Sequence, residues 1–106
     1  MVDTLARLEQ TIAARRGGDP QSSYVAKLFA AGTPQIAQKV GEEAVETVIA
    51  ALAADTGKLV AEASDLMFHL LVLLQDRGVA IADILNELER REGISGIAEK
   101  ASRTAE

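Results

Sequence analysis

The chain has 106 residues, no cysteine, 3% aromatic residues and 48% hydrophobic residues. This length suits one domain with a thin core, and the lack of cysteine excludes disulfides and thiolate metal sites. The 11 basic and 16 acidic residues give a net charge of −5, which argues against nucleic acid as a partner. The first residues lack an apolar run of the signal-peptide type, and no apolar stretch reaches about 18 residues. We therefore expect a cytoplasmic protein with no membrane partner.

Five segments have the apolar spacing and the end signals of α-helices. The predicted helices span residues 3–16, 24–31, 33–54, 58–76 and 81–91. Asp55-Thr56-Gly57 is the predicted break between the two long central helices, which would form an antiparallel hairpin. The predicted fold class is all-α, a helical bundle of four to five helices completed by dimerisation. We expect one domain over residues 1–93 and a mobile tail over residues 94–106.

Two groups of carboxylates lie in the central helices. The first contains Glu42, Glu43 and Glu46, and the second contains Glu62 and Asp65. At about 100° of rotation per residue, each group occupies one side of its helix. The two groups lie at similar distances from the turn, so the hairpin would bring them face to face.

The carboxylates border positions that we expect to be buried. One apolar arc lies beside the first group: Val45, Val48, Ile49 and Leu52. Residues 66–74 are apolar nearly throughout, so this helix is expected to be buried almost all round. A chain this short has too few helices to cover it without a second copy, which predicts a homodimer. Gly41, inside the third helix, would permit a close backbone approach beside the acids.

Such a grouping of carboxylates calls for a cation. Buried anions cost several kcal/mol each unless an opposite charge neutralises them. Oxygen ligands without cysteine suit a hard cation, Mg²⁺ or Mn²⁺, better than Zn²⁺. Mg²⁺ usually completes its coordination shell with waters and substrate phosphates. The sequence therefore predicts a carboxylate-lined metal site for phosphoryl or pyrophosphoryl chemistry.

The spacing of the acids, Glu-Glu-x-x-Glu, fifteen residues, then Glu-x-x-Asp, resembles that of the all-α nucleoside triphosphate pyrophosphatase superfamily. Four segments, SSYVAKLFAAG, IAQKVGEEAVET, EASDLMFHLLVLL and ILNELERREG, resemble more narrowly the phosphoribosyl-ATP pyrophosphatase family. The resemblance covers residues 5–93. It implies Mg²⁺-dependent hydrolysis of the α,β phosphoanhydride of phosphoribosyl-ATP, giving phosphoribosyl-AMP and pyrophosphate in histidine biosynthesis. It also implies a homodimer.

Carried over onto this chain, the metal motif of the family matches all five acids. Two pairs spaced i, i+3 suggest four direct ligands: Glu43, Glu46, Glu62 and Asp65. Glu42 is left for a second metal or for activating water. Either Glu42 or Glu46 would accept the proton of the attacking water, and the sequence does not decide between them.

Three basic residues are candidates for binding substrate phosphates: Lys27, Lys39 and Arg90, the last across a dimer interface. His69 lies one turn after Asp65. It either orients a metal-binding carboxylate or is a core histidine satisfied by hydrogen bonds. The aromatic side chains, including Tyr24 and Phe68, are interpreted as packing residues.

Two other functions fit the acidic pattern. A housekeeping nucleotide pyrophosphatase of the same superfamily would cleave dUTP or damaged nucleotides, and a helical dimerisation module would catalyse nothing. The four segments favour the phosphoribosyl-ATP enzyme. They leave open whether a separate phosphoribosyl-AMP cyclohydrolase associates with it.

Overall fold

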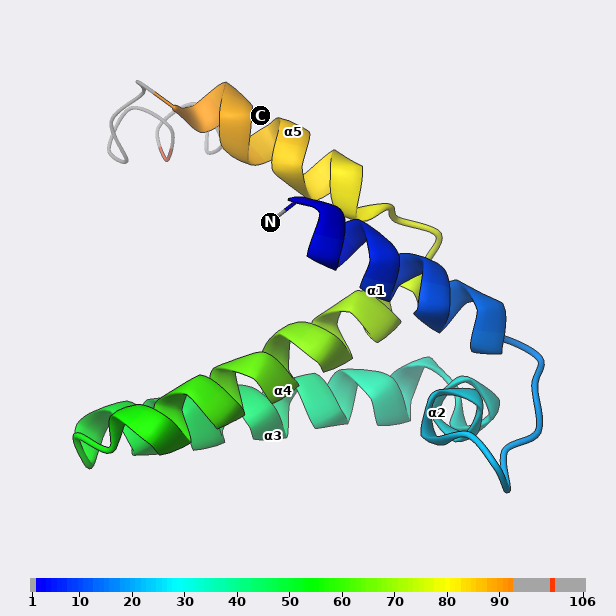
Figure 1. The fold of residues 1–106 in the computed structure, drawn as a ribbon, viewed down its shortest axis with the longest axis horizontal. Coiled ribbons are helices and arrows are strands. Elements are labelled where there is room, and N and C mark those ends of the chain that lie inside the picture. The colour runs from blue at the N-terminus through cyan, green and yellow to red at the C-terminus, as the bar shows by residue number, and fades with distance from the viewer. Residues whose placement is uncertain (1, 93–99, 101–106) are drawn as a thin grey trace.

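The structure, a computed structural model, describes residues 2–92 and residue 100 of the chain. Its regular elements in this part are helices, arranged as in Figure 1, with no strand among them. They are α1 (Val2–Arg15), α2 (Tyr24–Ala31), α3 (Thr33–Leu52), α4 (Thr56–Asp76) and α5 (Ile81–Arg91). The predicted all-α fold class is confirmed for the described part of the chain. The tail predicted over residues 94–106 lies outside the described residues, apart from Lys100.

The ends of α2 follow from capping residues in the sequence. The Ser23 hydroxyl accepts a hydrogen bond from the backbone N–H of Ala26 at 3.1 Å, which satisfies one free donor of the first turn. The helix ends at Gly32, whose φ of 97° is a conformation that favours glycine. Pro34 then lies in the first turn of α3, where its missing N–H costs nothing. The predicted bounds of this short helix are confirmed.

The turn between α3 and α4 lies two residues earlier than predicted, at Ala53, Ala54 and Asp55. The physical reason is that Asp55 caps α4. Its Oδ1 accepts a hydrogen bond from the Lys58 N–H at 3.0 Å, which places Thr56 and Gly57 in the first helical turn. The left-handed residue of the turn is Ala54, with φ of 59°, and not a glycine.

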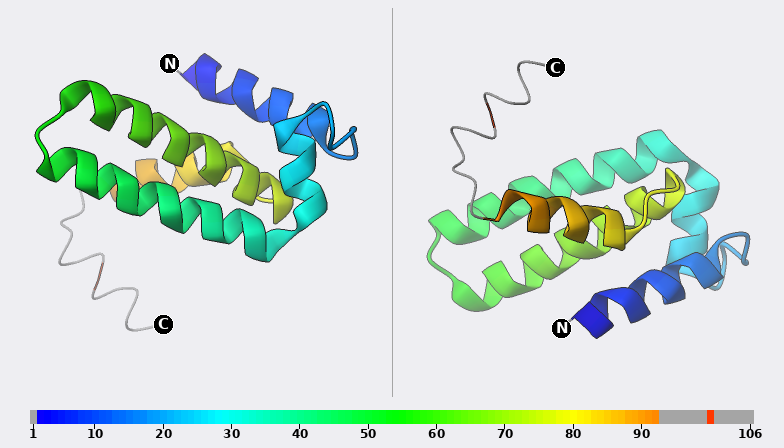
Figure 2. Two further views of the ribbon diagram at one scale, coloured as in Figure 1. Left: turned by 90° about the horizontal axis from the view of Figure 1, so that it is seen from below. Right: turned by 90° about the horizontal axis from the view of Figure 1, so that it is seen from above.

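The two long helices, α3 and α4, lie antiparallel and side by side, as Figure 2 shows. α1 and α2 pack against the end of this hairpin that is opposite the turn (Figure 1). The buried apolar core lies there and consists of Ile12, Val25, Leu28, Ile36, Leu71 and Val72. α5 packs on α1, and the carboxylate of Glu9 accepts a hydrogen bond from the Ile81 N–H at 2.7 Å. Within the described residues, no helix is long and apolar enough to cross a membrane.

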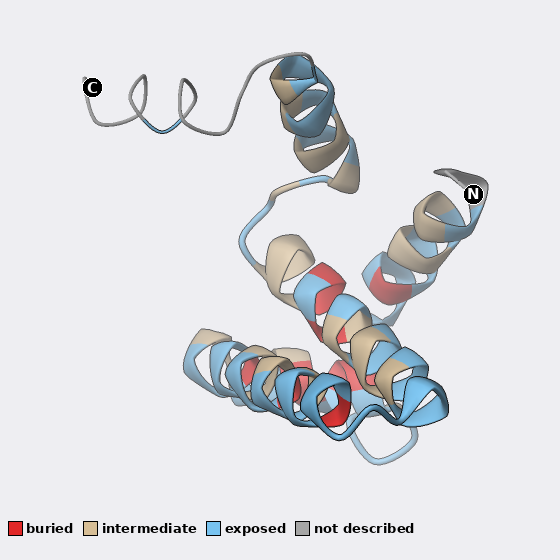
Figure 3. Cartoon of the chain, turned by 90° about the vertical axis from the view of Figure 1, so that its left-hand side faces the viewer, coloured by how far each residue is buried: buried red, intermediate tan, exposed pale blue. Residues whose placement is uncertain are grey.

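The apolar arc of α3 that was predicted to be buried is exposed. Its members have large exposed fractions: Val45 59%, Val48 56%, Ile49 55% and Leu52 82%. The buried residues of α3 are instead Ile36, Glu43 and Ala50, spaced by two helical turns on the side that faces α4. Exposed residues accordingly run along much of the hairpin in Figure 3.

One chain covers residues 66–74 only in part, as expected if a second copy completes their burial, and burial all round stays a prediction. Leu71 and Val72 are buried, whereas Met67 and Leu70 are 49% and 40% exposed, because no described helix covers their side of α4. The close backbone approach predicted at Gly41 is absent as well, since an added Cβ would meet no atom within 4 Å. Both findings concern the same hairpin, whose outer faces are covered by no other described helix.

Candidate metal centre

The hairpin brings three of the five predicted acids into one cluster. Glu43 comes from α3, and Glu62 and Asp65 come from α4. One carboxylate oxygen from each lies within 4.8 Å of the other two. Members of the two predicted groups thus lie face to face, because the short turn places them at similar heights along the two helices.

The charges of this cluster are poorly compensated by protein groups. The Oε2 atoms of Glu43 and Glu62 are buried, and no described residue donates a hydrogen bond to either. The pKa of Glu62 is raised above its usual value, first by a hydrogen-bonding contact with the Glu46 carboxyl, then by desolvation and by the neighbouring negative charges. Unpartnered, buried carboxylate oxygens on two facing helices fit a hard divalent cation such as Mg²⁺.

Glu46 lies at the edge of the cluster. It is exposed, its carboxyl contacts Glu62, and it lines with Ile49, Lys58 and Glu62 a cavity of about 220 Å³. This cavity is open to solvent on the exposed side of the hairpin, so water can reach Glu46 beside the buried carboxylates.

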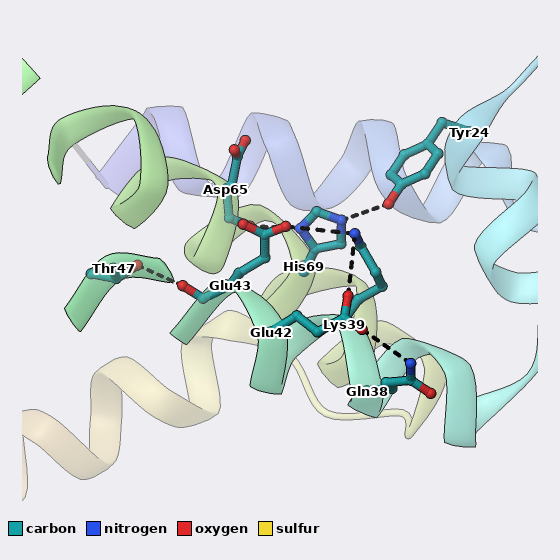
Figure 4. Close-up of polar contacts among 8 residues, drawn as sticks. All are labelled: Tyr24, Gln38, Lys39, Glu42, Glu43, Thr47, Asp65 and His69. Atoms are coloured by element: carbon teal, nitrogen blue, oxygen red, sulfur yellow. Dashed lines mark hydrogen bonds and ion pairs between the residues drawn. The ribbon is translucent and has the colours of Figure 1, made fainter. Parts of the chain in front are cut away.

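Glu42 does not join the cluster. Its carboxylate accepts a hydrogen bond from Gln38 Nε2 at 3.0 Å and lies 3.6 Å from the ammonium of Lys39 (Figure 4). The Gln38 hydrogen bond, followed by the Lys39 charge, lowers the pKa of Glu42. The structure therefore leaves Glu42 outside the cluster, held by Gln38 and by Lys39, whose ammonium also pairs with Glu43.

Lys39 borders the cluster, as the sequence predicted for a residue beside the acids. Its ammonium lies 3.6 Å from Glu43 and 3.6 Å from Glu42. The pKa of Lys39 is raised, most strongly by Tyr24; desolvation, the next largest effect, opposes this rise, and the negative charges of Glu43 and Glu42 add to it. Lys39 therefore places a positive charge beside the buried carboxylate of Glu43 on α3.

His69 is buried and uses both ring nitrogens. Nδ1 lies 2.7 Å from the backbone carbonyl oxygen of Asp65, and Nε2 lies 2.8 Å from the hydroxyl of Tyr24. The bond to Asp65 thus goes to its backbone and not to its carboxylate, which was the partner expected for an orienting histidine. Sequence reasoning took Tyr24, the one tyrosine of the chain, for a packing residue and missed this contact.

The other two predicted phosphate-binding residues lie apart from the cluster. Lys27 is exposed on α2, and its side chain makes no hydrogen bond or ion pair with a described residue. Arg90 donates to the Glu87 carboxylate through Nε at 3.0 Å and NH2 at 2.7 Å. It is in the last turn of α5, which Figure 1 shows leaving the hairpin beyond α1. Within one chain, the structure does not bring Arg90 to the carboxylates.

Fold and site together define the class: an all-α protein with a carboxylate cluster, suited to a hard divalent cation, between two antiparallel helices. A sequence profile described as phosphoribosyl-ATP pyrophosphohydrolase matches residues 5–92, and the chain belongs to this family. The family that the sequence motifs predicted is therefore confirmed.

Relatives named phosphoribosyl-ATP pyrophosphatase match nearly the whole chain. One from Rhizorhabdus wittichii is 65% identical over 103 residues, which is 97% of each chain. One from Novosphingobium aromaticivorans is 67% identical over 102 residues, covering 96% of this chain and 95% of the relative. One from Erythrobacter litoralis is 64% identical over 96% of this chain and 98% of the relative.

Proposed function

We propose that this chain hydrolyses the α,β phosphoanhydride of phosphoribosyl-ATP, giving phosphoribosyl-AMP and pyrophosphate, as a step of histidine biosynthesis. The observation that carries the proposal is the cluster of Glu43, Glu62 and Asp65, with two unpartnered buried oxygens, in a chain of this family. In the reaction a water oxygen attacks phosphorus, the bridging P–O bond breaks, and pyrophosphate leaves.

The proposed cofactor is Mg²⁺, with Mn²⁺ as a substitute, and the residues proposed to hold it are Glu43, Glu62 and Asp65, with Glu46 beside them. When bound, such a cation neutralises negative charge on the phosphate oxygens and on the leaving pyrophosphate. The carboxylates themselves repel a polyphosphate, so the protein groups that attract it must be cationic, and Lys39 is the nearest of the predicted ones.

For the proton of the attacking water, Glu46 is the better of the two predicted bases. Its carboxyl contacts Glu62 at the edge of the cluster and faces a solvent-accessible cavity. Glu42 is held by Gln38 and Lys39, and its lowered pKa makes it a weaker base. Glu46→Gln should therefore reduce kcat far more than Glu42→Gln, in steady-state assays of both variants under the same conditions.

The active species is proposed to be a cytoplasmic homodimer. The support is the set of exposed apolar residues on the hairpin, which a second copy would cover. Arg90 is proposed to bind phosphate only across that interface, since its own chain keeps it away from the cluster. Phosphoribosyl-AMP would pass to a separate cyclohydrolase, as the reaction class that consumes this product.

The test is pyrophosphate release from phosphoribosyl-ATP, dUTP and ATP, each with Mg²⁺ and with a chelator. We expect release from phosphoribosyl-ATP, dependent on the divalent cation, and much less from the other two. Preference for dUTP would make the chain a housekeeping nucleotide pyrophosphatase. No release from any of them, by a protein shown to be folded, would leave the dimerisation module as the function. Asp65→Asn, which removes one charge from the cluster, is the matched inactive control.

A further inference from the structure

A second cavity lies where α1, the start of α2 and α4 meet, and none of the five acids lines it. It has a volume of about 310 Å³ and opens to solvent. Its polar lining includes Arg15, Ser22 and Ser23, and its aromatic lining consists of Tyr24 and Phe68. Small-molecule sites have volumes of about 300–1,000 Å³, so this cavity has room for a part of a large nucleotide and not for the whole.

Two side chains that line this cavity have hydrogens without an acceptor among the described residues. The Arg15 side chain is exposed and forms no hydrogen bond or ion pair with them. The Ser23 oxygen accepts the Ala26 N–H at 3.1 Å, so the hydroxyl hydrogen of Ser23 remains available. By contrast, the Ser22 hydroxyl donates to the Asp19 carbonyl oxygen at 3.3 Å. A guanidinium and a hydroxyl hydrogen are donors that suit a phosphate.

Tyr24 connects this cavity to the carboxylate cluster. It lines the cavity, and its hydroxyl lies 2.8 Å from His69 Nε2. The other ring nitrogen, Nδ1, lies 2.7 Å from the Asp65 carbonyl oxygen, and Figure 4 shows His69 between Asp65 and Tyr24. One imidazole ring therefore separates the wall of the cavity from the backbone of a cluster residue. The two sites are close enough for one nucleotide-sized ligand to contact both.

The substrate of the proposed reaction has two anionic ends. Phosphoribosyl-ATP carries a triphosphate, as ATP does, and also a phosphoribosyl group, which ATP lacks. The cluster, with its cation and Lys39, serves the triphosphate, so the second phosphate needs a partner elsewhere. A buried phosphate without such a partner loses hydration and gains nothing in return, which makes this partner a means of selecting phosphoribosyl-ATP over ATP.

We propose that this cavity binds the phosphoribosyl group of the substrate, with the Arg15 guanidinium paired to its phosphate and Ser23 donating a hydrogen bond to the same phosphate. The cavity then determines the preference for phosphoribosyl-ATP over ATP. This inference rests on the proposed function for the identity of the whole substrate. The competing explanation is that Arg15 and Ser23 only stabilise the ends of α1 and α2.

Steady-state kinetics test the preference. Arg15→Gln should raise KM for phosphoribosyl-ATP about tenfold, with a smaller change in kcat, because the lost pair holds a part of the substrate that does not react. The inhibition constant of ATP should not change. Arg15→Lys keeps the charge and should recover part of the loss. Arg7→Gln is the matched control, since Arg7 is also exposed on α1 but does not line the cavity, and it should behave as wild type.

Binding of ribose 5-phosphate to the full chain, with a chelator present, tests the cavity without any cleavage. NMR titration should give a Kd in the millimolar range for wild type, about tenfold weaker binding for Arg15→Gln and no change for Arg7→Gln. Ser23→Asp keeps the cap of α2, because Asp also accepts the Ala26 N–H, but it removes the hydroxyl hydrogen and adds a negative charge. It should abolish this binding without lowering the melting temperature.

No binding of ribose 5-phosphate to wild type, or binding that survives both Arg15→Gln and Ser23→Asp, would overturn the proposal. Equally tight binding of inorganic phosphate would make the cavity a general anion site and would overturn it as well. An equal loss of affinity for ATP and phosphoribosyl-ATP in Arg15→Gln would have the same consequence. If wild type does not cleave phosphoribosyl-ATP, the proposed function fails, while the ribose 5-phosphate titration still decides the role of the cavity.

Discussion

The carboxylates of the cluster differ from one another in what surrounds them, and Glu62 is the clearest case. Its raised pKa means that the folded chain binds a proton more tightly than the unfolded chain does. Between pH 4.5, the ordinary pKa, and the raised pKa of Glu62, the unfolded state binds fewer protons than the folded state. In that range the free energy of unfolding therefore falls as pH rises. Glu62→Gln should therefore be more stable than wild type at neutral pH without divalent cations, and the gain should vanish in acid.

Glu87 provides a control, because its effect on stability should change with pH in the opposite direction. Its hydrogen bonds with Arg90 and Arg91 lower its pKa from 4.5 to about 2. The stability that it contributes is present above 4.5 and is lost as pH falls toward about 2. Glu87→Gln should thus be less stable than wild type at neutral pH. Denaturant unfolding of both variants and of wild type, with a chelator, from acidic to neutral pH measures how each stability difference changes with pH. A change in the same direction for both variants would refute this account of Glu62.

Asp65→Asn tests the metal site at a single atom. The substitution keeps the shape of the side chain and removes one negative charge and one anionic ligand. We expect most turnover to be lost, while the variant without metal is no less stable than wild type. In wild type, Mg²⁺ at about 100 times its Kd should add about 2.7 kcal/mol, and this gain should shrink in the variant. Calorimetry with and without Mg²⁺ decides: early unfolding of the variant in both conditions would make Asp65 a structural residue.

At the scale of helices, capping chemistry made most boundaries predictable. Ser23, Gly32 and Pro34 act within a few residues of themselves, so the sequence alone was enough to delimit α2 and the start of α3. The turn before α4 was missed because Asp55 has two roles open to it in a sequence, turn residue or helix cap. Only the Lys58 N–H at 3.0 Å from its carboxylate distinguishes them.

The same turn yields a prediction about stability. Ala54 adopts a φ of 59°, which costs a residue with a Cβ about 1–2 kcal/mol. Ala54→Gly removes that cost and adds unfolded-state entropy, so the net gain in unfolding free energy should be about 0.5–1 kcal/mol. Ala51→Gly, an exposed position within α3, should instead lose about 0.5–1 kcal/mol. Urea unfolding of both variants measures the difference, and a loss in both would contradict the strained turn.

At the scale of the whole molecule, the faces that sequence reasoning assigned to the core are exposed in one chain. The pattern of Val45, Val48 and Ile49 correctly identifies an apolar face, but a sequence does not say whether the same chain or another one covers it. The cluster itself could be predicted from the sequence. The helical period and the length of the turn determine that Glu43, Glu62 and Asp65 lie on facing sides of the two helices. The Tyr24–His69 contact could not be predicted, because it depends on how α2 crosses the hairpin.

That exposed face predicts dimerisation in solution. Sedimentation at micromolar concentration should give twice the mass of one chain. Val48→Glu places a charge within the apolar face and should shift the protein toward monomer. Gln10→Glu, an exposed position on α1, carries the same charge change outside the hairpin and should leave the mass unchanged. A wild-type monomer, or equal masses for both variants, would remove the hairpin face as the interface.

The three-residue turn at Ala53, Ala54 and Asp55 also bears on the order in which the chain folds. Both halves of the cluster belong to one hairpin, so closing it brings together residues that are near in sequence. The apolar core instead joins Ile12 to Leu71 and Val72, which lie more than half of the chain's length away in the sequence. We therefore expect the carboxylates to meet early, before α1 is docked, so that Mg²⁺ bound to them would already stabilise the folding transition state. Stopped-flow refolding should then accelerate with Mg²⁺, whereas an effect on the unfolding rate alone would place assembly of the site after the barrier.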